Sequence, residues 1–491
     1  MRTRWLIAAS IITVLFTLQS LRRVANGPWG VDGSYYMQVA RHVAAGDGLL
    51  TSVCLYDQGL RSLPSRTNIY PLWPLLLGFS ARILPLQYAS TFLPRVFFIL
   101  DLILLFALTD RIAKGYWAFT AILLLGLNSS FFSSTCYPYT EGLALGCMLG
   151  ALLMFDVADR GRQPIHYALC GVIAGLAFLT RSQMLFVGIA LAIVLIVMRA
   201  SWLALASFCA GYAVTVLPWI GYLTTFIKPL TPAALIGMYS ETPGLPAFDQ
   251  HVAVHGFRGY LADRLGGVLV MFNPLSEFSF VRSFGAAALL IPIAAVYLLW
   301  RRRWVGGALA AATALTGFLL CAALLEAHNR FFLKWLFGYR HSLPFILLLV
   351  IATVQMNGRY SRIIVMLLVA ASIAMYVPRV IVFATEPPLV WPSRGEKQLV
   401  SWLQRNDRSA ILLTTNAQAL AVVSDAYFRW TTCEQSPAEI ARVLQLVRTD
   451  YVLVYEEEKR CSFARGLDAR ANPLMSFGDA PNRIVLLKVA R

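Results

Sequence analysis

Apolar stretches long enough to cross a bilayer recur along the first 384 residues, and they constrain the fold more than any other feature. An α-helix needs about 20 mainly apolar residues to span a membrane. In lipid, every backbone polar group must be bonded within a helix or a closed barrel. Charged residues make up only 14% of this chain, against about 25% in a typical globular protein. The sequence therefore predicts a polytopic α-helical membrane protein with about 11 spans, at residues 5–21, 94–113, 117–133, 142–158, 165–180, 184–198, 202–222, 284–300, 304–325, 342–356 and 363–382.

The basic residues between these spans predict their orientation. Cytoplasmic loops of membrane proteins carry an excess of Lys and Arg, and residues 1–384 carry a net charge of +15. With a cytoplasmic N-terminus, every inside loop is basic: Arg111 and Lys114, Arg160 and Arg162, Arg199, Arg301 to Arg303, and Arg359 with Arg362. The first span is interpreted as an uncleaved helix, because Arg22-Arg23-Val24 follows it instead of small residues. An odd number of spans then places residues 385–491 outside.

The first outer loop, residues 22–93, opens with a candidate functional helix over Tyr35–Ala45. Apolar side chains share one of its faces at helical spacing: Tyr36, Val39, Ala40 and Val43. Gly46 supplies a helix stop, and Asp32 or Ser34 can cap the start. We expect this amphipathic helix to lie along the membrane surface. There, Asp32 is placed to act as a general base on a lipid-borne substrate, and the alternative is that it is only a helix cap.

A second helix of the same loop is expected over Tyr70–Ile83. This apolar run is short, contains two prolines and includes Arg82. If it crossed the membrane, Arg301 to Arg303 would lie outside, against the positive-inside pattern. We therefore expect it to lie at the outer surface, with a true span as the alternative.

The long apolar runs end before Pro387-Pro388. The residues that follow predict a small α/β domain outside the membrane. Residues 410–415, 451–455 and 484–489 are typical of strands. Residues 436–447 are typical of a helix that begins with a capping box of Ser436 and Glu439. The domains are therefore predicted to be 1–384, which holds the membrane part, and 385–491. Cys433 and Cys461 lie in the second domain and can pair in an oxidising compartment.

Few charged residues remain to do chemistry on the outer face. Glu141 follows Tyr137-Pro-Tyr-Thr, so a break in the helical pattern delivers a carboxylate to the interface. Its simpler role is that of an anion at a helix N-terminus. Basic residues stand at several span boundaries: Arg95, Arg181, Lys228, Arg340 and His341. Such residues often only anchor a helix end at the interface, but several on one face also describe a phosphate pocket.

Several motifs, in this order along the chain, resemble those of the GT-C glycosyltransferases. The motifs are Asp32-Gly-Ser-Tyr-Tyr-Met, Tyr70-Pro-Leu-Trp-Pro, Tyr137-Pro-Tyr-Thr-Glu141, Gly175-Leu-Ala-Phe-Leu-Thr-Arg181 and Arg340-His-Ser-Leu-Pro344. The nearer resemblance is to bacterial aminoarabinose or galacturonate transferases to lipid A and to protein O-mannosyltransferases. It implies that Asp32 lies at the catalytic centre, that Glu141 is the second acid, and that residues near Tyr70, Arg181 and Arg340 hold a lipid phosphate. The chain departs from the pattern at Gly33, where many relatives carry a second acid, and at Tyr70, where some carry a basic residue.

The resemblance implies a glycosyltransferase that moves a sugar from a polyprenyl-phosphate to an acceptor hydroxyl on the outer face, with inversion. We expect Arg95, Arg181, Lys228, Arg340, His341 and Tyr70 to bind the donor phosphate, and Tyr35 and Tyr36 to bind the acceptor. No cofactor is required by the sequence. A divalent metal, Mg²⁺ or Mn²⁺, is left open, with Asp32 and Glu141 as its ligands if one binds. The expected location is a bacterial inner membrane, with the C-terminal domain in the periplasm.

Two other classes of function are left open. A transporter or flippase would use Asp101 and Arg95 as intramembrane coupling charges, although no inverted repeat is visible. A lipid-binding protein without turnover is the other alternative. A role in nucleic-acid binding is not expected, because no soluble basic face is visible.

Overall fold

The computed structural model describes four long stretches of the chain and several short ones. These are residues 2–20, 30–54, 62–112, 116–226, 309–310, 312–316, 369–370, 373–374, 377–378, 381, 392–431, 433, 435–465, 467, 471–480 and 483–489. The chain divides into two compact units. The helical unit comprises Met1–Arg23, Phe92–Gly237 and Pro246–Glu386, and the α/β unit comprises Val24–Thr91, Met238–Leu245 and Pro387–Arg491.

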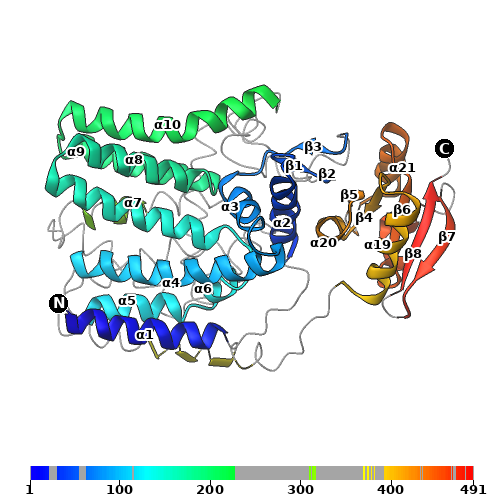
Figure 1. Cartoon of the computed structure of the whole chain (residues 1–491), viewed down its shortest axis with the longest axis horizontal. Helices are drawn as coiled ribbons and strands as arrows, with labels where there is room; N and C mark the ends of the chain where they lie inside the picture. Colours follow the sequence, from blue (N-terminus) through cyan, green and yellow to red (C-terminus); the bar gives the residue numbers. More distant parts are fainter. Residues whose placement is uncertain are drawn as a thin grey trace. The chain divides into compact units, whose positions relative to one another are not determined.

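The helical unit is built mainly of apolar helices, joined by short helical turns (Figure 1). In chain order they are α1 (Arg2–Ser20), α4 (Leu86–Ile112, which begins before the unit), α5 (Tyr116–Gly126), α6 (Ser129–Ser134), α7 (Glu141–Gly161), α8 (Pro164–Phe178), η1 (Ser182–Met184), α9 (Leu185–Val197) and α10 (Trp202–Phe226). Among the described residues, α1, α4, α7 and α10 are long and apolar enough to cross a membrane. The chain is therefore an integral membrane protein, as its apolar pattern predicts.

The first seven predicted spans coincide with helices. The third, predicted over 117–133, is divided into α5 and α6, because Asn128 accepts a hydrogen bond from the Phe131 backbone N–H at 3.0 Å and starts a new helix. The predicted spans at 284–300 and 342–356 lie outside the described residues, and most of 304–325 and 363–382 does as well. The number of 11 spans therefore stays a prediction.

Ion pairs join three helix ends of the helical unit. Arg4 near the start of α1 contacts Asp110 near the end of α4 at 3.2 Å. Asp156 in the last turns of α7 accepts from Arg111 at 2.7 Å and from Arg160 at 3.1 Å. The start of α1 and the ends of α4 and α7 therefore lie together. The predicted orientation requires this, because it assigns all three ends to the cytoplasmic side.

The α/β unit is built on a six-stranded sheet in the order β2-β5-β4-β6-β8-β7. Its strands are β2 (Val53–Cys54), β5 (Tyr427–Trp430), β4 (Ile411–Thr414), β6 (Tyr451–Tyr455), β8 (Ile484–Val489) and β7 (Ala471–Phe477). The first four are parallel to one another, β8 is antiparallel to β6, and β7 is antiparallel to β8. The predicted strands at 410–415, 451–455 and 484–489 are confirmed as β4, β6 and β8.

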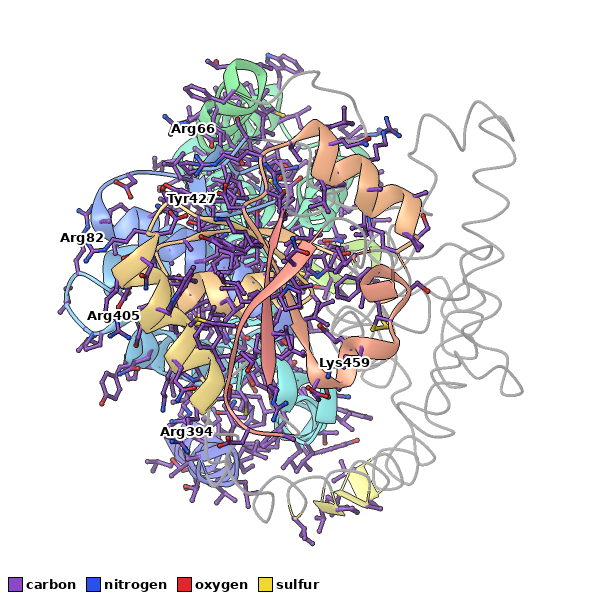
Figure 2. The ribbon with its side chains drawn as sticks, turned by 90° about the vertical axis from the view of Figure 1, so that its right-hand side faces the viewer. Arg66, Arg82, Arg394, Arg405, Tyr427 and Lys459 are labelled. Atoms are coloured by element: carbon purple, nitrogen blue, oxygen red, sulfur yellow. A yellow bond between two sulfur atoms is a disulfide. The ribbon has the colours of Figure 1, made fainter. Side chains whose placement is uncertain are left out.

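Helices and a small hairpin complete this unit. The helices are α2 (Gly30–Ala45), α3 (Leu72–Ser80), α19 (Arg394–Asn406), α20 (Ala417–Val423), α21 (Pro437–Leu446), η4 (Glu456–Arg460) and α22 (Ser462–Arg465), and β1 (Leu50–Thr51) pairs with β3 (Ser65–Arg66). The predicted helix at 436–447 is confirmed as α21. Arg394 and Arg405 mark the two ends of α19 (Figure 2). A capping box of Ser393 and Glu396 begins this helix. The helix was not predicted from the sequence.

One strand of the sheet comes from the first loop. Val53 pairs with Phe428, and the Phe428 N–H donates to the Ser52 carbonyl at 2.8 Å. The predicted division assigned this loop to residues 1–384, whereas Val24–Thr91 form one compact unit with Pro387–Arg491. A two-residue strand carries too little pattern to be predicted from sequence.

The helix α2 is longer and more buried than predicted. It begins at Gly30, so Asp32 lies in its first turn and not at its cap. The side chains of Ser34–Ala40 are buried on all faces of the helix, including Ser34 and Gln38 on the face expected to be polar, whereas Asp32 and Arg41 are half-buried. Helices α3 and α20 pack against it. The expectation of one solvated face is therefore wrong for α2, because protein covers that face.

Helix α3 has nine residues and so is too short to cross a membrane. The expectation of a short helix within Tyr70–Ile83 is confirmed. Its predicted position at the membrane surface stays a prediction.

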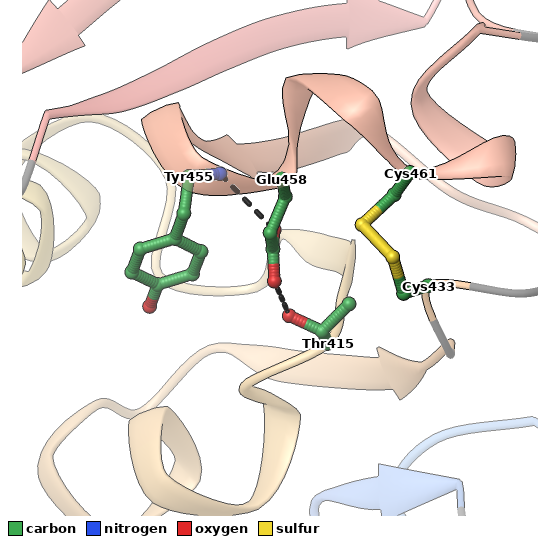
Figure 3. The surroundings of a disulfide bond; sticks show 5 residues. All are labelled: Thr415, Cys433, Tyr455, Glu458 and Cys461. Atoms are coloured by element: carbon green, nitrogen blue, oxygen red, sulfur yellow. Dashed lines mark hydrogen bonds between the residues drawn. A yellow bond between two sulfur atoms is a disulfide. The ribbon is translucent and has the colours of Figure 1, made fainter.

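The two cysteines of the C-terminal segment form a disulfide, Cys433–Cys461. It lies beside a polar cluster at the end of β6 (Figure 3), where Glu458 accepts from the Tyr455 N–H at 3.1 Å and from the Thr415 hydroxyl. Burial raises the pKa of the Tyr455 phenol well above its ordinary value, and Glu396 adds to this effect. The sequence placed both cysteines in the same domain, and the structure shows that they pair.

Candidate active site

Asp32 projects from the first turn of α2 and is half-buried. Three hydrogen bonds from other residues of α2 hold this helix in place. Gln38 donates to the Thr51 hydroxyl at 2.8 Å and accepts from the Ser52 N–H at 2.9 Å. The Tyr35 hydroxyl lies 3.2 Å from the Thr67 hydroxyl. The β1–β3 hairpin region thus fixes the helix from one side.

Helix α3 fixes α2 from another side by a close backbone approach. A Cβ atom added to Gly78 would lie 2.6 Å from the Val43 Cβ and 2.8 Å from the Ala40 carbonyl oxygen. Only glycine allows this distance. Just after α3, Arg82 donates to the Val43 carbonyl near the end of α2 at 3.1 Å, and the same carbonyl accepts from the Gly46 N–H at 3.2 Å. Asp32 therefore lies on a helix that its neighbours hold in a fixed position.

The predicted acceptor and phosphate residues of this unit are mainly buried. Tyr36 and Tyr70 are each 6% exposed, and Tyr70 immediately precedes the N-cap of α3, Pro71. Tyr35 is equally buried. Tyr35, Tyr36 and Tyr70 belong to the same unit as Asp32, and their proposed contacts with acceptor or phosphate stay predictions.

In the helical unit, Glu141 and Arg181 form a buried ion pair. The Arg181 Nη1 donates to the Glu141 Oε1 at 2.6 Å and to the Thr140 hydroxyl at 3.2 Å. Their side chains are 3% and 11% exposed. Glu141 is the first residue of α7, as its position after Tyr137-Pro-Tyr-Thr predicts. Its negative charge is stabilised there by the helix dipole as well as by the arginine.

The pairing changes what Arg181 can do. The sequence motifs imply separate roles for Arg181, as a phosphate ligand, and for Glu141, as the second acid. The structure brings them into direct contact from positions 40 residues apart in the chain. An incoming phosphate would share the guanidinium with Glu141, because Arg presents five N–H donors. In the structure, Arg181 therefore neutralises the charge of Glu141.

The other predicted basic residues fall into two groups. Arg95 lies on α4, and its Nε is buried without a hydrogen-bond partner among the described residues. Lys228, Arg340 and His341 lie outside the described residues. Asp32 and Glu141 belong to different units, so the shared catalytic centre that the resemblance implies for them stays a prediction.

The described residues do not assemble a metal centre. Within the parts of the chain that the structure describes, no three His, Cys, Asp or Glu side chains gather as metal ligands. Glu141, one of the two predicted ligands, already accepts from Arg181, whose positive charge opposes a cation at the same carboxylate. The described residues therefore fit a divalent ion poorly.

Two sets of contacts made by α2 were not predicted from the sequence. Arg41 donates to Asp425 at 2.8 Å and to the Val422 carbonyl at 3.2 Å, which ties α2 to the end of α20. His42 lies 3.0 Å from Asp47 and 2.7 Å from the Ser52 hydroxyl. These Asp, His and Ser side chains contact one another in the same order as a hydrolase triad. Because Ser52 is only 2% exposed, we assign the three side chains a structural role.

No protein-family model and no curated protein matches the sequence. Solved structures do match over its whole length. ArnT from Cupriavidus metallidurans bound to undecaprenyl phosphate has a TM-score of 0.58 at 15% identity, with 100% of this chain and 99% of that chain covered. The fold is that of the GT-C glycosyltransferases.

Two further GT-C structures agree with this result. The Archaeoglobus fulgidus oligosaccharyltransferase in the apo form has a TM-score of 0.56 at 13% identity, with 97% of this chain and 76% of that chain covered. The arabinofuranosyltransferase AftD from Mycobacteria, mutant R1389S, has a TM-score of 0.59 at 14% identity, and the chain spans 42% of its length. The GT-C resemblance of the sequence motifs is thereby confirmed at the level of the fold.

Proposed function

We propose that this protein is an integral-membrane glycosyltransferase that transfers a sugar from a polyprenyl-phosphate donor to an acceptor hydroxyl. The observation that carries the proposal is the GT-C fold over the entire chain, shared with a structure bound to undecaprenyl phosphate. The half-buried carboxylate of Asp32, on a helix fixed at several points, supports it. The site faces the outside of a bacterial inner membrane in this proposal.

The proposed reaction is a single displacement at the anomeric carbon. Asp32 accepts the proton of the acceptor hydroxyl while the hydroxyl oxygen bonds to the anomeric carbon from the face opposite the phosphate. The bond from the anomeric carbon to the phosphate oxygen breaks, and its electron pair leaves with the polyprenyl phosphate. The configuration at the anomeric carbon is inverted. Asp32 then returns its proton to water.

The negative charge that develops on the leaving phosphate needs nearby cations and donors. We assign this role to Arg95, Lys228, Arg340 and His341, with Tyr70 and Arg181 as further donors. The buried Nε of Arg95 supports its part in this set, because a buried donor without a protein partner can serve a ligand. We assign Glu141 to the orientation of Arg181, which it contacts directly.

The substitution Asp32→Asn tests the proposal. It preserves the size of the side chain and removes its ability to accept a proton, so turnover should fall at least about a hundredfold. Donor binding should change little, because other residues hold the phosphate. The assay is transfer of a radiolabelled sugar from purified polyprenyl-phosphate donors to a membrane extract, with the protein reconstituted in vesicles.

A matched control is Asp47→Asn. Asp47 lies just past the other end of α2 and pairs with His42, with half of its side chain exposed. This variant should retain most of the activity. If folded Asp32→Asn protein transferred sugar at the wild-type rate, Asp32 would not be the base.

A further inference from the structure

A groove of about 660 Å³ opens at one end of the sheet in the α/β unit. Among the residues that line it are Asp407, Tyr451, Asn472, Pro473 and Lys488. They come from the end of α19 and from strands β6, β7 and β8. The groove lies entirely within residues 407–489, so it is distinct from the residues proposed for sugar transfer.

The floor of the groove is one row of side chains across three strands. Lys488 on β8 pairs directly with Tyr451 on β6 and with Asn472 on β7. Residues that pair directly across a sheet point to the same face. A phenol ring, an ammonium and an amide are therefore presented side by side on a rigid surface.

This row is open because the covering helix ends before it. Trp402 of α19 packs on Tyr451, with ring centroids 5.7 Å apart, and on Phe477 at 6.3 Å. The helix ends at Asn406 and Asp407 follows as its C-cap. Farther along β6 and β8 the same face carries fully buried leucines, Leu453 and Leu486. The polar row is thus the uncovered end of an otherwise apolar face.

The edge strand is also irregular at this point. The pairing of β7 with β8 shifts between Pro473 and Met475, which leaves Leu474 as an extra residue. Leu474 lines the groove. Such bulges re-aim neighbouring side chains and are frequent beside functional sites.

The charges that line the groove balance. Arg448 and Lys488 are matched by Asp407 and Asp450. Arg448 donates to Asp450 at 3.1 Å, and this partner raises the pKa of the Arg448 guanidinium. Asp450 also accepts from the Ile411 N–H at 3.0 Å. A phosphate or an acidic polymer would gain little from such a site, because its net charge is zero.

We propose that the groove binds a neutral saccharide. The Tyr451 ring offers apolar surface to the C–H face of a sugar ring. Asn472, Lys488 and Asp407 offer both donors and acceptors to its hydroxyl groups. Binding of the saccharide is independent of the transfer reaction, whereas its identity as the acceptor of that reaction rests on the proposed function.

The test measures binding of the full-length protein in detergent to a panel of neutral oligosaccharides built from mannose, galactose, glucose or arabinose. At least one should bind. The double variant Asn472→Ala/Lys488→Ala should weaken it about tenfold or more, because the hydrogen bonds of both side chains to the saccharide are lost. Both residues are exposed on the sheet surface, so the variant should fold, which thermal unfolding checks.

The control is Lys459→Ala, which removes an exposed lysine beyond the opposite end of β6 (Figure 2). It should bind the saccharide as the wild type does. Failure of every neutral oligosaccharide to bind, or equal binding by the double variant and Lys459→Ala, would overturn the proposal. Stronger binding of vesicles that contain undecaprenyl phosphate, dependent on Lys488, would overturn the assignment of a neutral ligand.

The two proposals can fail separately. Asp32→Asn should bind the saccharide normally while it loses transfer. In transfer assays, the groove variant should raise the KM for a saccharide acceptor and leave kcat and the KM for the donor unchanged. If Asp32→Asn retained full transfer, the proposed base would be wrong and the groove would be unaffected.

Discussion

The contact between Glu141 and Arg181 is the electrostatic feature with the clearest energetic consequence at the scale of single residues. Both side chains are almost completely buried. A buried pair adds little net stability over apolar residues, but removal of one partner leaves an uncompensated charge in a medium of low polarity.

This asymmetry gives a prediction for the two variants. Arg181→Ala should destabilise the protein by about 3–5 kcal/mol, because the Glu141 carboxylate stays buried without its cation. The double variant Arg181→Ala/Glu141→Gln should recover much of this loss, since no charge remains. Thermal unfolding of the purified proteins in detergent measures both. Equal or greater instability of the double variant would show that the two residues act independently.

Asp101 is a second buried acid of the helical unit. It lies on α4 and its side chain is 0% exposed. Neither of its carboxylate oxygens has a hydrogen-bond partner among the described residues. It packs against α7, where a Cβ atom added to Gly146 would lie 2.9 Å from its Oδ1. A transporter would use such a charge for coupling, whereas the proposed transfer reaction does not need it.

We therefore predict that Asp101→Asn retains sugar transfer within about twofold, because it preserves the shape of the side chain and the transfer reaction uses other groups. The assay is the same as for Asp32→Asn. Loss of transfer in a folded Asp101→Asn protein would contradict the prediction. Gly146→Ala provides the contrast: it should lower stability by about 1–3 kcal/mol, because the added methyl overpacks the contact between α4 and α7.

At the scale of elements, the position of α2 depends on a helix nearly 400 residues later in the chain. Arg41 is the main polar tie, through Asp425 and the Val422 carbonyl. Burial lowers the pKa of Arg41, and Asp425 opposes that effect. Because α2 carries Asp32, the C-terminal segment contributes to the geometry of the proposed base.

Arg41→Ala should accordingly lower kcat about tenfold with little change in the KM for the donor, because it loosens the base without touching the phosphate. Asp425→Asn should have a smaller effect, since the bond to the Val422 carbonyl remains and Asp425 is largely exposed. Steady-state kinetics of the two variants test this order. An unchanged kcat for Arg41→Ala would show that the tie has no role in catalysis.

At the scale of the whole molecule, orientation across the membrane decides which substrates the site can reach. The Cys433–Cys461 disulfide supports an oxidising compartment for the C-terminal segment. The basic loops lead to the same orientation. A cysteine at position 302 should therefore be labelled only from the cytoplasmic side, and tags near Gln250 and after Arg491 only from outside. Labelling of position 302 in intact cells by an impermeant reagent would show that the predicted orientation is wrong, and the proposed outer site would be excluded.

Local patterns were sufficient to predict much of this protein. Continuous apolar runs predicted the helices α1, α4 and α7 to α10, because a membrane span must satisfy its own backbone within one segment. Short apolar runs that contain β-branched or aromatic residues predicted β4, β6 and β8. Scarcity of charge drew attention to Asp32, Glu141 and Arg181, since few acids and bases occur near the span boundaries.

Contacts between distant segments were decided only by the tertiary structure. The pairing of Val53 with Phe428, the burial of α2 on all faces, and the contact of Glu141 with Arg181 each join segments that no local pattern relates. The groove at Tyr451, Lys488 and Asn472 likewise depends on the register of three strands and on where α19 ends. The sequence determines which segments are helices and strands through short-range backbone and hydrophobic preferences. The partners of a side chain depend on the packing of the whole chain, because apolar burial is not directional.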